Sequence, residues 1–154
     1  MMNPKIIHAI AGTLAMLIIA TFWTTTTISE LFLSVSAIVA VKHYIAYYGI
    51  ACLAVCMAMT GGTGNFLSKS RKGRLITDKQ KRMKIIALNG ICVMLPSAIF
   101  LNYKASSGQF DTIFYVVQVI ELMVGIVQLT LLGKNFQAGL KMAGRLRKKK
   151  PAVA

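Results

Sequence analysis

The residues best able to do chemistry lie in one apolar segment near the C-terminal end of the chain. Within residues 112–133, the polar side chains of Gln118, Glu121 and Gln128 stand among valines, isoleucines and leucines. In a helix this spacing places all three on one face, together with Gly125. A carboxyl group between two amides can exchange a proton and make hydrogen bonds inside a bilayer. We therefore predict a buried polar site around Glu121.

Lys42 and His43 are the nearest charged or titratable candidates to join this site. Both begin a second apolar segment and lie within ~10 Å of the outer boundary, from which Glu121 is ~14 Å deep. A lysine stem spans several ångströms, so a cluster of Lys42 or His43 with Gln118 and Glu121 is geometrically allowed. In the alternative interpretation, Lys42 extends to the lipid headgroups and Glu121 only links helices.

A second polar belt is predicted nearer the opposite boundary. Asn89 and Gln128 each lie ~8 Å from that boundary, and His8 begins its helix on the same side. The alternative is structural, because amide side chains often hydrogen-bond neighbouring helices and a boundary histidine is wetted by headgroups.

Two cofactors are compatible with these residues. His8 and His43 are possible ligands of a b-type haem, but they begin their helices on opposite sides, roughly 20 Å apart. One haem iron therefore cannot bind both within a single subunit, and haem b would need another ligand. A quinone needs a hydrogen-bond donor and a proton-exchanging group beside a lipid-accessible pocket, which Glu121 with His43 or Lys42 would provide.

The three cysteines, Cys52, Cys56 and Cys92, all lie in apolar segments. Cys52 and Cys56 are spaced i, i+4 and share a helix face, which would permit a soft-metal or thiol site with Cys92. The simpler interpretation is three buried free thiols.

Four apolar segments must position these residues: 6–28, 37–60, 85–101 and 112–133. Each approaches the ~20 helical residues that cross a bilayer, and the chain is 56% hydrophobic and only 14% charged. The sequence thus predicts an all-α integral membrane protein with a four-helix transmembrane domain at 1–133. The sequence Gly61-Gly62-Thr63-Gly64 should end the second helix, leaving a basic loop at 61–84, and Pro96 should kink the third.

The basic residues predict the orientation. The chain has 18 Lys and Arg against 4 Asp and Glu, and all but Lys42 and Lys104 lie before residue 6, in the loop 61–84, or in the tail 134–154. The positive-inside rule then predicts an up-down-up-down bundle with both termini cytoplasmic, in a bacterial-type inner membrane. The basic tail is expected to be an amphipathic helix on anionic lipids or a solvated stop-transfer segment. Nucleic acid is not an expected partner, because no aromatic residues alternate with these charges.

These features predict a non-enzymatic accessory component or subunit of a membrane system. That system could be linked to redox chemistry or to quinones. It would associate with other membrane subunits or with a second copy of itself. A b-type haem electron-transfer protein and a small proton-coupled carrier are the alternatives. If the chain is part of an enzyme, that enzyme is a membrane oxidoreductase, since no GxSxG, HExxH or paired-acid motif is present.

Overall fold

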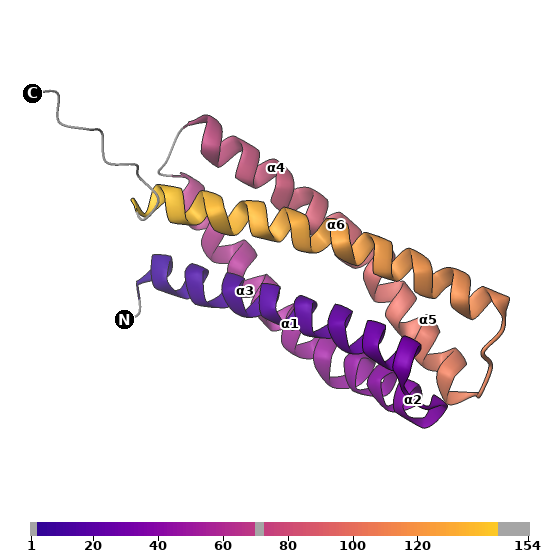
Figure 1. Ribbon diagram of the computed structural model, residues 1–154. Coiled ribbons are helices and arrows are strands. Elements are labelled where there is room, and N and C mark those ends of the chain that lie inside the picture. Colours follow the sequence, from indigo (N-terminus) through magenta and orange to yellow (C-terminus); the bar gives the residue numbers. More distant parts are fainter. Residues whose placement is uncertain (1–2, 70–72, 145–154) are drawn as a thin grey trace, which may run out of the picture.

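The computed structural model describes residues 3–69 and 73–144. Within these ranges every regular element is helical, and the helices form four rods (Figure 1). Residues 1–2, 70–72 and 145–154 lie outside the described residues. Residues 70–72 belong to the predicted basic loop, and residues 145–154 belong to the predicted basic tail.

Two of the four rods are single helices and two contain a π-helical turn. The single helices are α1 (Pro4–Phe32) and α6 (Thr112–Met142). The second rod consists of α2 (Val35–Tyr44), a π-helical turn at Ile45–Gly49 and α3 (Ile50–Lys69). The third consists of α4 (Arg74–Asn89), a π-helical turn at Gly90–Met94 and α5 (Leu95–Ser106). The chain therefore stays helical through Pro96, and the π-helical turn lies just before the position where proline removes a backbone donor.

The α1 and α6 helices begin at side-chain caps. The side chain of Asn3 accepts a hydrogen bond from the Lys5 backbone N–H at 3.0 Å, and Pro4 follows it at the first helical position. Asp111 caps α6 by accepting from the Phe114 N–H at 3.0 Å. These caps satisfy backbone donors that an α-helix leaves without partners at its start.

The rods are longer than the predicted apolar segments, and one predicted boundary is wrong. Helix α3 continues through Gly61, Gly62 and Gly64 to Lys69, and α4 begins at Arg74, so most of the predicted loop 61–84 is helical. Glycine disfavours a helix by about 1 kcal/mol per residue, but here it also allows close packing. A Cβ on Gly64 would lie 3.1 Å from the His8 ring on α1. Likewise, α6 includes the first nine residues of the predicted tail, up to Met142.

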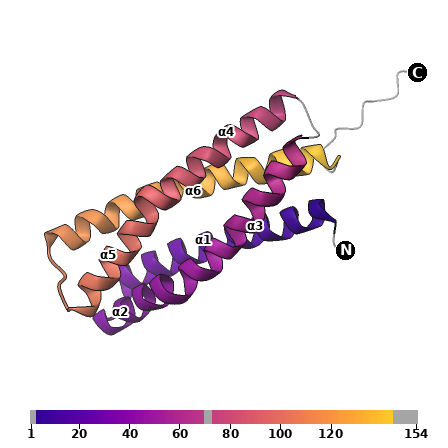
Figure 2. The same cartoon turned by 180° about the vertical axis from the view of Figure 1, so that it is seen from behind.

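The rods pack mainly as α1 against α3, α1 and α4 against α6, and α2 against α5. One apolar core, of Ile38, Leu101, Ala105 and Phe114, lies among α2, α5 and α6. A second, of Ile19, Ile86 and Leu132, joins α1, α4 and α6. The N-terminus and the end of α6 lie at the same end of the bundle, and α2 and α5 reach the opposite end (Figures 1 and 2).

The outward faces of the rods are apolar. On α6, Val119 and Met123 are 59% and 62% exposed, and Ile120, Ile126 and Val127 also face outward. A soluble protein rarely exposes so large a continuous apolar surface. Four rods are long and apolar enough to span a bilayer: Pro4–Phe32, Val35–Lys69, Arg74–Ser106 and Thr112–Met142. These are the features of a multi-pass membrane protein.

Candidate functional site

The centre of the candidate site is a buried lysine between two carboxyl groups. Lys42, on α2, has a side chain that is only 3% exposed. Its Nζ lies 3.5 Å from Glu121 Oε2 on α6 and 3.7 Å from Glu30 Oε1 on α1. Three helices thus contribute one ionisable side chain each, and we call Glu30, Lys42 and Glu121 the ionic cluster.

Gln118 fixes the geometry of this cluster from α6. Its side-chain oxygen accepts a hydrogen bond from Lys42, and its amide nitrogen donates to Glu121 Oε2 at 3.3 Å. Both ends of the amide are therefore used, which determines its orientation. The i, i+3 spacing of Gln118 and Glu121 on one helix face makes the second contact local.

The ionic cluster contains two carboxyl groups but one cation. With both carboxyl groups ionised it would carry a net negative charge, and a charged group at bilayer depth costs a few kcal/mol. Glu30 Oε1 is buried and accepts no hydrogen bond among the described residues. The cluster is electrically neutral when one of its carboxyl groups holds a proton, so its composition suits proton exchange.

Glu30 is the member that the sequence did not reveal. The predicted first helix ended at residue 28, which placed Glu30 in a connection, whereas α1 continues to Phe32. Only Leu33 and Ser34 separate α1 from α2, so the hairpin returns Lys42 toward the last turn of α1. The available signal was an acid at the end of the first apolar segment and a lysine near the start of the second.

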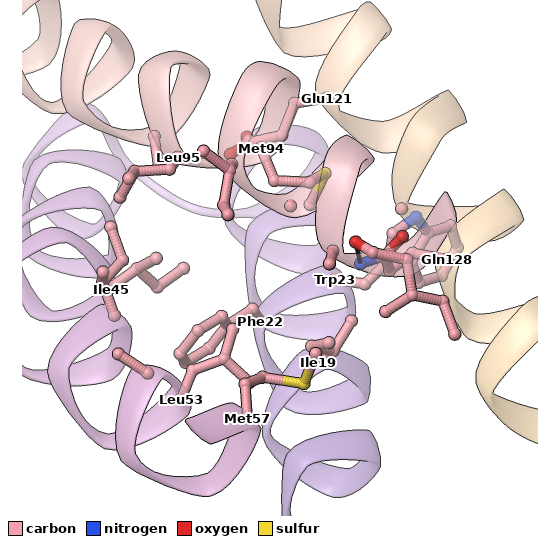
Figure 3. A pocket seen from close by; sticks show the side chains of 18 of the residues that line it. Ile19, Phe22, Trp23, Ile45, Leu53, Met57, Met94, Leu95, Glu121 and Gln128 are labelled. Carbon is pink, nitrogen blue, oxygen red and sulfur yellow. Dashed lines mark hydrogen bonds between the residues drawn. The ribbon is translucent and has the colours of Figure 1, made fainter. Parts of the chain in front are cut away.

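An apolar cavity of about 450 Å³ adjoins the cluster (Figure 3). Its walls come from α1, α3, α4, α5 and α6, and aliphatic, aromatic and methionine side chains form most of them. Glu121 and Gln128 are polar groups on the α6 wall. Cavities of this size and composition bind small lipophilic molecules, with a few polar groups setting the orientation.

Both π-helical turns contribute to the cavity wall. Ile45 comes from the first turn, and Gly90, Ile91 and Met94 come from the second. A π-helical turn inserts one extra residue into a helix and changes which side chains face inward, and such turns are frequent at functional sites. Their convergence on one cavity indicates that the cavity is a specific feature of the fold.

Two aromatic side chains of α1 line the cavity and pack on glycines. Trp23 Nε1–H donates to the Leu122 carbonyl oxygen at 3.0 Å. A Cβ on Gly125 would lie 2.8 Å from Trp23 Cδ1, and a Cβ on Gly49 would lie 2.3 Å from Phe22 Cζ. Both glycines therefore leave the space that the rings occupy, which holds this wall in place.

Gln128 is buried on the same wall. Its Nε2 donates to the Ile86 carbonyl oxygen at 2.9 Å, while its Oε1 is buried without a partner among the described residues. Asn89 is half-buried at the end of α4, and no hydrogen bond between Asn89 and Gln128 occurs in the described part of the chain. The predicted belt of Asn89, Gln128 and His8 is thus not a single cluster.

His8 lies at the end of the bundle that holds the N-terminus. Its Nδ1 lies 3.0 Å from the Thr60 carbonyl oxygen and 3.2 Å from Thr63 Oγ1, and its Nε2 lies 3.2 Å from Lys79 Nζ. An ammonium group only donates, so Nε2 accepts and the proton is on Nδ1. Both ring nitrogens already have partners.

The prediction that His43 joins the site is wrong. His43 is exposed, and its ring centroid lies 4.5 Å from that of Tyr47. Neighbouring positions on a helix point about 100° apart, so His43 faces outward where Lys42 faces inward. His8 and His43 are also on different helices with separate surroundings, and the fold does not bring them together as a pair of haem ligands.

The cysteines do not form the soft-metal site. Cys52 and Cys92 are exposed and Cys56 is half-buried, and all three are free thiols. Across residues 3–69 and 73–144, no group of three or more His, Cys, Asp or Glu side chains is placed to hold a metal ion.

Comparisons of the chain with protein-family models, with curated proteins and with solved structures give no match. The function is therefore inferred from the geometry of the ionic cluster and the cavity.

Proposed function

We propose that this protein binds a lipophilic molecule of the quinone class in the apolar cavity, as a subunit or accessory component of a membrane system. The observation that carries this proposal is the position of Glu121, which lines the cavity and also contacts Lys42 of the ionic cluster. A quinone carbonyl accepts a hydrogen bond, and a protonated carboxyl group donates one. The cavity would hold the ring and Glu121 would orient it.

The cavity matches this class of ligand in polarity. A quinone ring with a short part of its isoprenoid tail is mostly apolar, as is the wall formed by residues such as Leu53, Met57 and Met94. The proton held by the ionic cluster would be available to the bound carbonyl through Glu121. Reduction of a quinone takes two electrons and two protons. The chain's own residues would supply binding and one proton, the second proton would come from water at the membrane surface, and both electrons would come from a redox group on a partner subunit.

We place the protein in a bacterial-type inner membrane with both termini cytoplasmic. The support is the distribution of basic residues in the sequence, since all but Lys42 and Lys104 of the 18 lie before residue 6, at 61–84 or at 134–154. Basic residues near helix ends are retained on the cytoplasmic side. In this orientation the four rods would cross the bilayer in alternating directions, the first one outward.

Trp23 allows a direct test, because it is the only tryptophan in the chain and it lines the cavity. A decyl ubiquinone analogue titrated into detergent-purified protein should quench its fluorescence saturably. A micelle-dissolved tryptophan ester, measured in parallel, reports the collisional quenching that mere partitioning produces. Quenching of the protein no stronger than that of the ester would reject the proposal.

Two variants on α3 sharpen this test. Ala54 lines the cavity, so Ala54→Phe should fill it and weaken saturable quenching by tenfold or more, as expected when about 1.4 kcal/mol or more of binding is lost. Ala51 is exposed on the same helix and does not line the cavity, so Ala51→Phe should titrate like the wild type. Equal weakening by both substitutions would place the ligand outside the cavity.

A further inference from the structure

A second polar cluster lies away from the cavity, at the end of the bundle that holds the N-terminus. Lys79 and Arg82, spaced i, i+3 on α4, face α1 and α6 and are half-buried. Lys79 Nζ lies 3.2 Å from His8 Nε2 on α1, and Arg82 Nε donates to Asn135 Oδ1 on α6 at 2.7 Å. Two cationic side chains therefore meet two neutral partners between three helices.

Arg82 retains capacity for an anion. A guanidinium group has five N–H donors in a planar fork that matches the oxygens of a phosphate. Asn135 engages only its Nε, and no salt bridge joins Arg82 to a carboxylate among the described residues. Of the chain's 4 acidic residues, Glu30 and Glu121 pair with Lys42 and Asp111 with Lys104. The remaining one, Asp78, precedes Lys79 on α4 and is half-buried.

Asn135 supplies an independent indication of a ligand. The residue is only 5% exposed, and its Nδ2 is buried without a hydrogen-bond partner in the described part of the chain. The amide cannot be reversed to solve this, because its oxygen must face the Arg82 donor. An unsatisfied buried donor costs about 1–3 kcal/mol, and an anionic oxygen beside Arg82 would satisfy it.

The α6 surface next to Asn135 is in contact with Lys79. Gly139 follows Asn135 by one helical turn, and a Cβ built on it would lie 3.9 Å from Lys79 Nζ. Lys79 and Arg82 on α4 thus face Gly139 and Asn135 on α6 in matching order. Both cations are therefore held against the same face of α6.

We propose that Arg82, Lys79 and the Asn135 amide form a binding site for a phosphate group, and that its source is the headgroup of an anionic phospholipid. Arg82 and Asn135 Nδ2 would bind the phosphate oxygens, Lys79 would add positive charge, and His8 would position Lys79. The lipid source follows from location, because Arg82 is two turns from the start of α4, where a membrane-spanning rod ends. This site is separate from the cavity and does not depend on the quinone proposal.

Native mass spectrometry of the full-length protein released from detergent micelles would test the proposal. The probes are phosphatidylglycerol, phosphatidylcholine with identical acyl chains, and inorganic phosphate. We expect phosphatidylglycerol to remain bound in preference to phosphatidylcholine, with no comparable binding of inorganic phosphate. Both lipids carry a phosphate, but the choline cation of phosphatidylcholine would be repelled by Arg82 and Lys79, so equal retention of the two lipids would overturn the anionic-headgroup site. Binding of inorganic phosphate alone would overturn the lipid assignment.

Matched variants locate the binding on the protein. Arg82→Gln should weaken phosphatidylglycerol binding about tenfold to a hundredfold, the loss expected for charge-assisted hydrogen bonds. Lys134→Gln removes the same charge from an exposed position next to Asn135 and should bind normally. Equal weakening by both variants would show a diffuse charge effect and reject the site.

Asn135→Asp keeps the proposal testable if Arg82→Gln fails to fold. The new carboxylate would take the place of the anion beside Arg82 and repel a second one. This variant should show a higher unfolding temperature without lipid than the wild type, and no further rise on addition of phosphatidylglycerol. An undiminished rise would contradict the assignment of Asn135.

Discussion

Lys42 Nζ lies 3.5 Å from Glu121 Oε2, and this contact joins α2 to α6 where both side chains are removed from the surface. The same ammonium group lies 3.7 Å from Glu30 Oε1 on α1. One cation therefore holds two carboxyl groups from different helices. The stability of the bundle and the chemistry of its cavity wall both depend on this lysine.

We predict that Lys42→Met destabilises the protein by about 3–5 kcal/mol, because it leaves buried carboxyl groups without their cation. The free energy of unfolding is measured by circular dichroism during titration with a denaturing detergent. Lys104→Met is the matched control, since Lys104 pairs with Asp111, whose side chain is 46% exposed. This variant should lose much less free energy of unfolding. Equal losses would show that the Lys42 pairs add no more than a surface ion pair.

Gly125→Ala should displace the indole of Trp23, because the added Cβ would lie 2.8 Å from Cδ1. Overpacking of this kind costs about 1–3 kcal/mol, and the emission maximum of Trp23 should shift as its surroundings change. Gly133→Ala is the control on the same helix. A Cβ there meets nothing within 4 Å, so the variant should match or slightly exceed wild-type stability. An unchanged spectrum for Gly125→Ala would contradict the close contact.

Part of the site follows from the sequence and part does not. Helical periodicity places Gln118, Glu121 and Gln128 on one face, and an apolar opposite face requires the polar one to turn inward. Lys42 and His43 lie at nearly the same depth along their helix, so depth alone does not distinguish between them. Adjacent helical residues diverge by about 100°, and only the packing of α2 selects one of them.

The parts of the fold and of the site that the sequence does not reveal depend on tertiary contacts. Glu30 was missed because a helix end read from hydropathy is uncertain by a few residues, and Glu30 is third from the end of α1. Gly61, Gly62 and Gly64 have poor helix propensity, yet α3 is continuous through them, and Gly64 packs against His8. The cavity depends on two π-helical turns, for which periodicity gives no signal.

We predict that the stability of the protein depends on pH through Asp111, which lies just before the membrane-spanning rod α6. The hydrogen bond from Lys104, at 2.6 Å, and the one from the Phe114 backbone N–H lower the pKa of Asp111 below its ordinary value of 3.8. A lowered folded-state pKa means that this stabilisation is complete above the unfolded-state pKa and is lost as pH falls through the folded-state value. Unfolding temperatures between about pH 6 and about pH 3 would measure this loss.

Asp111→Asn is the matching variant, because asparagine still caps a helix but carries no charge. The difference in unfolding temperature between wild type and variant should be constant near neutral pH and shrink at acid pH. A difference that does not change with pH would show that the Lys104–Asp111 pair does not stabilise the folded state.

The charge balance of the ionic cluster gives the last prediction. With two carboxyl groups and one amine, the cluster is neutral only in states where at least one carboxyl group is protonated, and a buried net charge is costly. Infrared spectra of the wild type at neutral pH should therefore contain the C=O stretch of a protonated carboxylic acid. In Glu30→Gln, Lys42 and Glu121 alone form a neutral pair, so this band should disappear.

Asp78→Asn is the control for this experiment, because Asp78 is an acid outside the ionic cluster, and its band should match that of the wild type. A band of equal size in Glu30→Gln would mean that Glu121 keeps the proton by itself and leaves Lys42 with no ionised carboxylate. Loss of the band would instead show that the proton depends on Glu30, which either holds it alone or shares it with Glu121 across Lys42. Because only Glu121 of these three lines the cavity, a shared proton would reach a bound carbonyl through Glu121 and be held in reserve at Glu30.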